Sequence, residues 1–214
     1  MVAADLTDIP TTALAELVGR SQVMDMGIKP LWHGMPRMAG PAFTVRCPAG
    51  DHLMFHAAVY EAPPGSVLVA EAGSCDYALA GGNVCAVAQR RGVRAFVVDG
   101  AVRDVAEIRS RAFPVFGRGV IPFPGAKEHL DTLNDHPVRC GGVVVSPGDW
   151  VVADEDGVIV IPQTLKAVTL QKGAERTAKE SAQSLEEWES AHREKIRSIL
   201  QRKGRPLVEA PSEK

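Results

Sequence analysis

An arginine and an aspartate stand side by side at the end of an apolar run, in the segment "VVDGAVRD" (Val97–Asp104). Arg103 keeps its charge at any physiological pH and can hold a carboxylate through two parallel hydrogen bonds. Asp104 is a hard oxygen ligand of the kind that Mg²⁺ or Mn²⁺ prefers, with water in the remaining coordination positions. Together the two side chains could bind a 2-oxo acid: Arg103 would hold the carboxylate while a cation on Asp104 polarised the ketone.

A glycine-rich turn, "AGGNV", comes directly before a predicted helix that ends at Gly92. The first residues of a helix have backbone N–H groups without intrahelical partners, and the helix dipole favours an anion there. The backbone of Gly81, Gly82, Asn83 and Val84 is therefore a candidate anion-binding stretch. The turn lacks the GxGxxG spacing of a dinucleotide site, and the chain has no GxxxxGK[ST] phosphate loop.

A strand–helix–strand unit is expected to bring these two stretches together. Apolar runs at Val67–Ala72 and Arg94–Val98 flank the predicted helix, and the connection is long enough for a parallel pair. Ligands collect at the carboxyl edge of such a pair, where the Gly81–Val84 turn and the Arg103–Asp104 pair should face one cleft. Neighbours on a helix point about 100° apart, so Arg103 and Asp104 are expected to be poorly placed to neutralise each other. The alternative, that both form ordinary surface ion pairs, stays open.

The rest of the chain predicts an α/β domain over residues 1–162 and a helical extension over residues 163–214. An opening helix is expected to start at capping residues Thr7 and Asp8 and to close at Gly27. Further expected elements are a strand in "GPAFTVRC", a helix capped by Asp51, a strand from Pro114, two β runs in 141–162 split by turns, and one or two helices in 163–203.

Two further clusters could bind metals but are weaker candidates. His52 and His56 have the four-residue spacing of a helical zinc pair, yet no third ligand lies near them, so a packing or capping role is favoured. The "DEDG" segment resembles a calcium loop only superficially and is more typical of a hairpin turn. No lysine suits a Schiff base: Lys29 precedes proline, Lys127 lies in a polar loop, and the others belong to the charged C-terminal region.

Composition excludes several classes of partner. The formal net charge of −2 gives no electrostatic basis for nucleic-acid binding, and no apolar run reaches the roughly 20 residues needed to span a membrane. The N-terminus lacks a signal-peptide pattern. The four cysteines lie in apolar or glycine-rich settings without a CxxC pair, so reduced, partly buried thiols in a cytoplasmic protein are expected: Cys47, Cys75, Cys85 and Cys140.

The motifs from about residue 21 to residue 162 resemble the RraA-like family. The resemblance is carried by "GGNVCAVAQRRGVRAFVVDGAVRDVAEI", with "GPAFTV" upstream and "PVFGRG" and "VRCGGVVVSPGDWVVADEDGVIVIP" downstream. That family includes class II 4-hydroxy-4-methyl-2-oxoglutarate/4-carboxy-4-hydroxy-2-oxoadipate aldolases and protein regulators of ribonuclease activity. The resemblance implies a swivelling β/β/α-type fold, a homotrimer or hexamer, and a lyase dependent on Mg²⁺ or Mn²⁺ that releases pyruvate and decarboxylates oxaloacetate as a side activity.

The resemblance also implies roles for individual residues. The Gly81–Val84 backbone matches the stretch that holds the pyruvate carboxylate, Arg103 matches the substrate-binding arginine, and Asp104 matches the metal-binding aspartate. The aldolases add a glutamate from a neighbouring subunit, for which Glu175 and Glu180 are both candidates here, and the mixed-charge C-terminal segment is expected to pack on another subunit. The aldolases carry an acidic residue where this chain has Gly82, which leaves the second half of the substrate open.

Three functions therefore remain to be compared. The first is cleavage of a 4-hydroxy-4-methyl-2-oxoglutarate-like acid to pyruvate by a metal-dependent aldolase. The second is a ribonuclease-regulating binding protein without turnover, because such regulators can retain the "VRD" motif. The third is a lyase or decarboxylase for a different 2-oxo acid.

Overall fold

The computed structural model describes residues 5–207, and the chain divides into two units, Met1–Ala174 and Glu175–Lys214. The first unit contains a seven-stranded sheet with the order β1 (Lys29–Pro30), β5 (Val115–Val120), β4 (Ala95–Val102), β3 (Val67–Ala72), β2 (Met38–Cys47), β8 (Trp150–Asp154) and β9 (Gly157–Ile161). The four central strands β2 to β5 are parallel, whereas β1, β8 and β9 pair antiparallel. The strand–helix–strand prediction is confirmed, since β3 and β4 are direct parallel neighbours.

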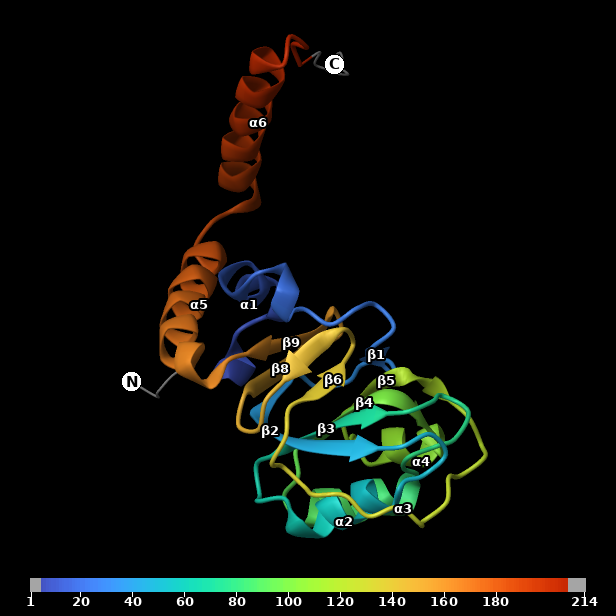
Figure 1. Ribbon diagram of the computed structural model, residues 1–214. Helices are drawn as coiled ribbons and strands as arrows, with labels where there is room; N and C mark the ends of the chain where they lie inside the picture. The colour runs from blue at the N-terminus through green and yellow to red at the C-terminus, as the bar shows by residue number, and fades with distance from the viewer. Residues whose placement is uncertain (1–4, 208–214) are drawn as a thin grey trace. The chain divides into compact units, whose positions relative to one another are not determined.

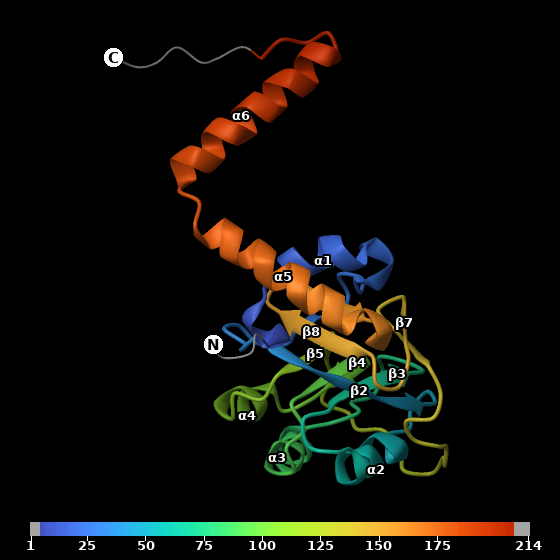
Figure 2. The same cartoon turned by 90° about the vertical axis from the view of Figure 1, so that its left-hand side faces the viewer.

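Three helices cover one face of the parallel strands: α2 (Leu53–Glu61), α3 (Gly82–Arg90) and α4 (Val105–Ser110). They lie together beside β3 and β4 in Figure 1, and the rotated view in Figure 2 shows the same layer. Phe96 of β4 lies between Phe55 and Phe113, with edge-on contacts at 4.9 Å between ring centroids. The strands are apolar on both faces because both faces are covered.

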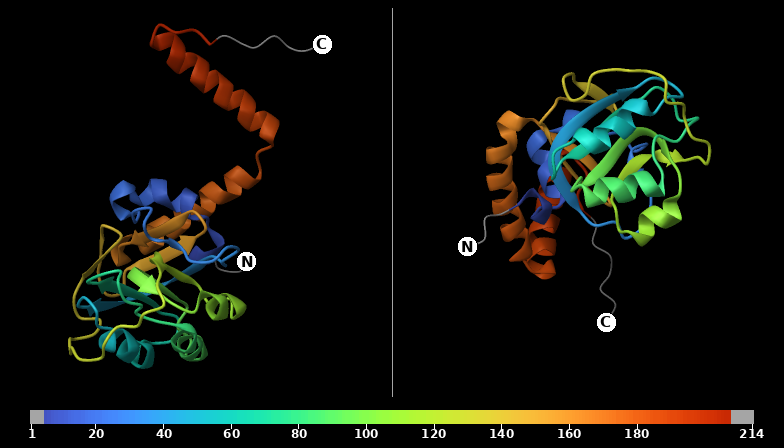
Figure 3. Two further views of the ribbon diagram at one scale, coloured as in Figure 1. Left: turned by 90° about the vertical axis from the view of Figure 1, so that its right-hand side faces the viewer. Right: turned by 90° about the horizontal axis from the view of Figure 1, so that it is seen from below.

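The opposite face is covered by a hairpin, whereas α1 (Thr11–Val18) and the start of α5 (Lys166–Ser181) pack on β8 and β9 from the side away from that hairpin. The hairpin of β6 (Val138–Cys140) and β7 (Val143–Val145) packs with β3, β4 and β8 in a second core. At the β8–β9 end, α1 and the first part of α5 pack on Ile159 and Ile161 (Figure 3). Gly173 leaves room for this contact, because a Cβ there would press on Leu14 and Ile9.

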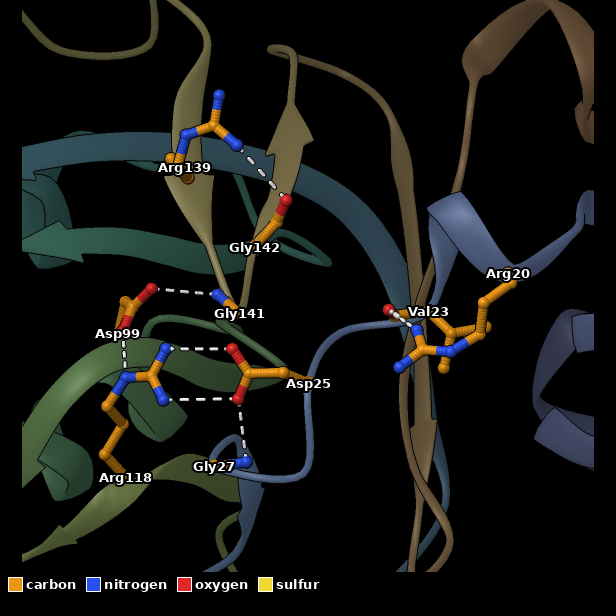
Figure 4. A network of polar contacts seen from close by, with 9 residues as sticks. All are labelled: Arg20, Val23, Asp25, Gly27, Asp99, Arg118, Arg139, Gly141 and Gly142. Carbon is orange, nitrogen blue, oxygen red and sulfur yellow. Dashed lines mark hydrogen bonds and ion pairs between the residues drawn. The ribbon is translucent and has the colours of Figure 1, made fainter.

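A polar network joins the chain before β1 to β4, β5 and the β6–β7 hairpin (Figure 4). Arg118 donates Nε–H to Asp99 and makes two further hydrogen bonds to Asp25, at 3.1 and 3.2 Å. The second carboxylate oxygen of Asp99 accepts the N–H of Gly141 at 2.8 Å. The network fixes the middle of β4, where the register against β5 shifts between Val98 and Ala101.

The second unit contains the end of α5 and helix α6 (Leu185–Arg202). A capping box starts α6: Ser184 accepts the N–H of Glu187, whose side chain accepts the N–H of Ser184. Within residues 5–207 no helix is long and apolar enough to cross a membrane. The prediction that this segment packs on another subunit stays a prediction.

The predicted α/β fold is confirmed, as are the strand in "GPAFTVRC", the hairpin turn at "DEDG" and two C-terminal helices. The single opening helix is wrong, because Gly19 has a left-handed φ of 85° and ends α1, which Thr7 and Asp8 do not cap. Buried, unpaired thiols are confirmed for Cys47, Cys85 and Cys140, whereas Cys75 is exposed.

Candidate functional site

The cavity of interest lies at the carboxyl ends of β3 and β4. The segment after β3 runs parallel to the end of β4, where Leu79 donates its N–H to Ala101 and Arg103 donates its N–H to Ala80, both at 2.9 Å. This pairing carries the start of α3 against the turn after β4. The result is a cavity of about 200 Å³, lined by His52, His56, Ala78, Leu79, Ala80, Gly81, Asn83, Val84, Arg103, Asp104, Pro124, Gly125 and Lys127.

The structure therefore brings together most of the predicted site. Arg103, Asp104 and the backbone of Gly81, Asn83 and Val84 line one cavity. Gly82 lies just behind its wall, and its N–H donates to Oδ2 of Asp104 at 3.1 Å. The N–H groups of Asn83 and Val84 belong to the first turn of α3, so they have no intrahelical acceptor.

Asp104 has a left-handed backbone, with φ 60° and ψ 39°, and forms the N-cap of α4. A residue other than glycine rarely adopts this conformation, and it costs free energy that the surrounding hydrogen bonds must offset. The turn aims the carboxylate back at the start of α3 instead of along α4. Within residues 5–207 no hydrogen bond is made to its Oδ1 atom, so this oxygen is available to a ligand.

The expectation that Arg103 and Asp104 point apart is wrong. Nε of Arg103 lies 3.6 Å from Oδ2 of Asp104, because the left-handed turn at Asp104 replaces the helical geometry that the expectation assumed. The two side chains are 41% and 40% exposed, so solvent screens the pair and it contributes little stability. Asp104 thus orients the guanidinium of Arg103, and this exposed ion pair leaves the guanidinium able to bind a ligand.

Close packing explains the two glycines at the start of α3. A Cβ on Gly81 would overlap the Asp104 carboxylate and crowd Arg103, while a Cβ on Gly82 would overlap the carboxylate of Glu107. Neither glycine has a positive φ, so packing rather than backbone freedom explains them. Glu107 is an acidic neighbour that the sequence analysis did not single out.

Lys127 lines the cavity, although the sequence placed it in an ordinary polar loop. Its loop is fixed by Asp51, which is buried and accepts the N–H groups of Glu128 at 2.7 Å and His129 at 3.2 Å. These hydrogen bonds and that from Leu53 outweigh burial and lower the pKa of Asp51. The prediction that Asp51 caps the helix is wrong, because the N-cap position of α2 is occupied by His52. Asp51, one residue earlier, accepts the N–H of Leu53 and holds the loop that carries Lys127.

His52 and His56 also line the cavity, stacked with ring centroids 4.2 Å apart and planes within 4°. Each ring makes a hydrogen bond to a backbone carbonyl. Nδ1 of His52 lies 3.3 Å from the carbonyl oxygen of Ala78, and Nε2 of His56 lies 3.1 Å from that of Leu79. Burial lowers the pKa of both rings, that of His56 to about 4, so both are neutral at pH 7. Stacked rings bonded to separate carbonyls do not form a zinc pair.

The donors at Asp104 fit a hard divalent cation that keeps most of its water. Mg²⁺ is usually held by one or two carboxylates together with water and substrate oxygens, and Asp104 presents one free carboxylate oxygen to the cavity. In the described part of the chain, no three or more His, Cys, Asp or Glu side chains are grouped to enclose a metal ion. A cation bound to Asp104 would therefore need oxygen atoms of water and of the bound acid to complete its coordination.

Glu175 and Glu180, the candidates for an acid from a neighbouring subunit, both lie on α5 in the second unit. Glu180 accepts a hydrogen bond from Nε of Arg176 at 2.7 Å. Which of them completes a site stays a prediction.

Residues 3–160 match the family model described as RraA-like: Aldolase/RraA. The chain belongs to the RraA-like family. Its relatives include the 4-hydroxy-4-methyl-2-oxoglutarate aldolase of Thermus thermophilus, 34% identical over 72% of this chain and 92% of the relative. A Halalkalibacterium halodurans protein, named provisionally as the same aldolase, is 39% identical over 81% of this chain and 82% of its own length.

Solved structures of RraA-like proteins match the fold. The RNA-processing inhibitor RraA from Thermus thermophilus has a TM-score of 0.65 and 32% identity, covering 72% of this chain and 93% of that chain. Streptomyces coelicolor RraAS2, an unusual member of the RNase ES inhibitor family, has a TM-score of 0.68 and 28% identity, covering 89% and 95%. The RraA-like family thus contains proteins named as aldolases and proteins named as inhibitors of RNA processing.

Proposed function

We propose that this protein is a divalent-metal-dependent lyase that cleaves 4-hydroxy-4-methyl-2-oxoglutarate-like acids and releases pyruvate. The observation that carries the proposal is the convergence of Arg103, the Asp104 carboxylate and the first amides of α3 on one cavity of about 200 Å³. A guanidinium, a row of N–H groups and a carboxylate with a free oxygen suit the oxo-carboxylate end of a small acid. The aldolase name of the Thermus thermophilus relative supports the same reaction.

Each group has a role in binding. Arg103 and the N–H groups of Asn83 and Val84 hold the substrate carboxylate, and Lys127 balances negative charge at the other end of the acid. Asp104 and water would hold Mg²⁺ or Mn²⁺, which supplies positive charge where the 2-oxo oxygen becomes negative. The fixed left-handed turn at Asp104 orients the carboxylate before the substrate arrives.

The chemistry is a retro-aldol cleavage. A water-relayed base takes the proton of the C4 hydroxyl, C4 becomes a carbonyl carbon, and the C3–C4 electron pair passes to C3. Arg103 and the α3 amides keep the carboxylate of the departing three-carbon fragment fixed while its 2-oxo oxygen carries the negative charge. Protonation of C3 by ordered water then gives the methyl group of pyruvate.

A lactate-dehydrogenase-coupled assay of pyruvate release tests the proposal, with 4-hydroxy-4-methyl-2-oxoglutarate as substrate and with Mg²⁺ or EDTA. We expect release with Mg²⁺, none with EDTA, and a loss of 100-fold or more, on the order of a removed charge-stabilising group, in Arg103→Ala and in Asp104→Ala. Arg109→Ala is the control, because Arg109 is exposed on α4 and outside the cavity lining. Retained activity in both site variants contradicts the proposal.

The second candidate is a ribonuclease-regulating binding protein, which the likeness to RraA from Thermus thermophilus favours. Such a protein needs neither metal nor turnover. A ribonuclease inhibition assay with metal-free protein separates the two, together with a panel of 2-oxo acids that includes oxaloacetate. Release of pyruvate only from another acid of the panel would assign a different lyase or decarboxylase.

We further propose that the protein works in the cytoplasm as a homotrimer or hexamer in which Glu175 or Glu180 completes the cavity of a neighbouring subunit. Glu175→Gln and Glu180→Gln, measured separately, should identify which one lowers pyruvate release. Analytical ultracentrifugation gives the subunit number, and a monomer that retains full activity contradicts this arrangement.

A further inference from the structure

We propose that α6 pairs with the α6 helix of a second copy of this chain, in antiparallel orientation and through one apolar stripe. The inference concerns the second unit alone, so it goes beyond the proposed reaction and does not depend on it. It follows from three features of α6: an apolar face that is uncovered, the symmetry of that face, and the division of charge along the helix.

The apolar face of α6 is uncovered in the part of the chain that the structure describes. No residue of α6 is buried, and Leu185 and Trp188 are 73% and 50% exposed. Trp188 stacks on His192 one turn later, with ring centroids 4.6 Å apart and planes within 10°, so the two rings form one continuous surface on the helix. A helix of 18 residues is marginal in water on its own, and an amphipathic helix gains most of its stability by packing. A partner for this face is therefore expected.

The stripe has the same spacing when it is read from either end. Its members follow one another at intervals of 3, 4, 4 and 3 residues, which keeps them on one side of the helix: Leu185, Trp188, His192, Ile196 and Ile199. The intervals are symmetric about His192. When two copies of α6 run in opposite directions with His192 at the centre, Leu185 lies opposite Ile199, and Trp188 lies opposite Ile196. A two-fold contact requires a self-complementary surface of this kind.

The charges of α6 favour the antiparallel orientation. The charged side chains before His192 are all acidic, and those after it are mostly basic: Glu186, Glu187 and Glu189, then Arg193, Glu194, Lys195, Arg197 and Arg202. Some of them pair within the helix, as Arg193 does with Glu189 at 2.6 Å, but the two halves still differ in net charge. Antiparallel pairing places the acidic half of one copy beside the basic half of the other and also aligns the two helix dipoles favourably. Parallel pairing would bring like charges together.

A two-fold contact joins copies in pairs, which bears on the subunit number. Within a homotrimer, pairing of this kind leaves one α6 of the three without a partner. Pairing between two trimers uses every α6 helix. Of the two assemblies proposed above, the α6 contact therefore favours the hexamer.

Analytical ultracentrifugation of the full chain tests the contact. Trp188→Asp/Ile196→Asp places two charges in the stripe and should halve the mass of the particle at micromolar concentration, whether the contact joins two single chains or two trimers. Ser190→Asp/Ser198→Asp is the matched control: it adds the same charges two residues further along, on the other side of α6, so the mass should stay as in wild type. An unchanged mass in Trp188→Asp/Ile196→Asp overturns the proposal.

Disulfide cross-linking tests the orientation and covers the case in which a stripe variant loses its helix. In a Cys75→Ser background, which removes the exposed thiol, Leu185→Cys and Ile199→Cys are oxidised separately and after mixing. The mixture should form cross-linked dimers, because the two positions lie opposite each other. Either variant alone should not, because its thiol and that of the second copy lie about 20 Å apart along the helix axis.

Two results of the cross-linking would overturn the proposal. Cross-linking of Leu185→Cys with itself would show a parallel pair, and a mixture without cross-links would show that α6 does not pair with a second copy. Cross-linked dimers in the mixture, with no pyruvate release from the uncross-linked wild type in Mg²⁺, would support the α6 contact and contradict the lyase, so the two failures are distinguishable.

Discussion

Arg103 and Asp104 are chain neighbours, and Nε of the arginine lies 3.6 Å from Oδ2 of the aspartate at the edge of one cavity. The left-handed backbone of Asp104 makes this possible and also directs Oδ2 to the N–H of Gly82. The arrangement links a substrate-binding cation, a metal-binding carboxylate and the start of α3.

Gly81→Ala should disrupt the cavity. The new Cβ would overlap the Asp104 carboxylate and press on Arg103, so we expect at least a tenfold loss of pyruvate affinity. Gly119→Ala is the matched control, because a Cβ at Gly119 has no atom within 4 Å and its backbone is not left-handed. Calorimetric titration of pyruvate measures both, and equal affinities in the two variants contradict the steric account.

Arg118→Met should destabilise the fold without changing the cavity. Arg118 is bonded to Asp25 and Asp99, which would lose their cation while remaining partly buried, with 45% and 18% of their side chains exposed. We expect a loss of about 1–3 kcal/mol in the free energy of unfolding, less than for a fully buried pair because solvent screens the network. Urea denaturation measures this, and unaltered stability would show that the network in Figure 4 contributes nothing net.

His56 should make stability depend on pH in the acidic range. Burial lowers its pKa from 6.5 to about 4, so between these values the unfolded chain binds a proton that the folded chain does not. The free energy of unfolding is therefore unaffected by this titration above pH 6.5. As the pH falls from 6.5 towards 4, protonation of His56 in the unfolded chain lowers that free energy by about 3 kcal/mol at most. His56→Phe should unfold with a shallower pH dependence in that window, as measured by denaturation at pH 4.5, 5.5 and 7; parallel profiles would contradict the assigned pKa.

Thiol reactivity should single out Cys75. Burial raises the pKa values of Cys47 and Cys85 to about 12, and that of Cys140 well above its usual value, whereas Cys75 is exposed. Iodoacetamide at pH 8 should modify one thiol per native chain within minutes and all four after denaturation. Mass spectrometry gives the count, and Cys75→Ser should leave the native protein unmodified. Rapid labelling of a second site would show that a core opens locally.

Local sequence patterns predicted the parallel unit because apolar runs and glycine stops determine strands and helix ends directly. Val67–Ala72 and the stop at Gly92 are of this kind, and both agree with the structure. The opening helix failed because a single left-handed glycine, Gly19, outweighs continuing helical spacing. The close approach of Arg103 and Asp104 was missed for a related reason, because the local sequence gives no sign that Asp104 adopts a left-handed conformation.

The sequence also failed to predict which side chains from distant segments lie at the site. Lys127 reaches the cavity only because Asp51, far away in the chain, holds its loop, and periodicity within one segment carries no information about that pairing. Glu107 was overlooked for the same reason: its position beside Gly82 depends on how α3 and α4 pack. A more useful clue was the pair of adjacent glycines, which indicates that something must approach the start of α3 closely.

Coupled binding of Mn²⁺ and oxalate, a small dianion that resembles the enolate of pyruvate, tests the central claim most directly. The measurement is the Mn²⁺ dissociation constant from electron paramagnetic resonance, with and without oxalate, in wild type, Arg103→Met and Asp104→Asn. If one cavity holds the anion on Arg103 and the cation on Asp104, oxalate should tighten Mn²⁺ binding at least tenfold in wild type, and either substitution should abolish that coupling. Mn²⁺ affinity that is independent of oxalate in wild type, or coupling that survives both substitutions, would contradict the account.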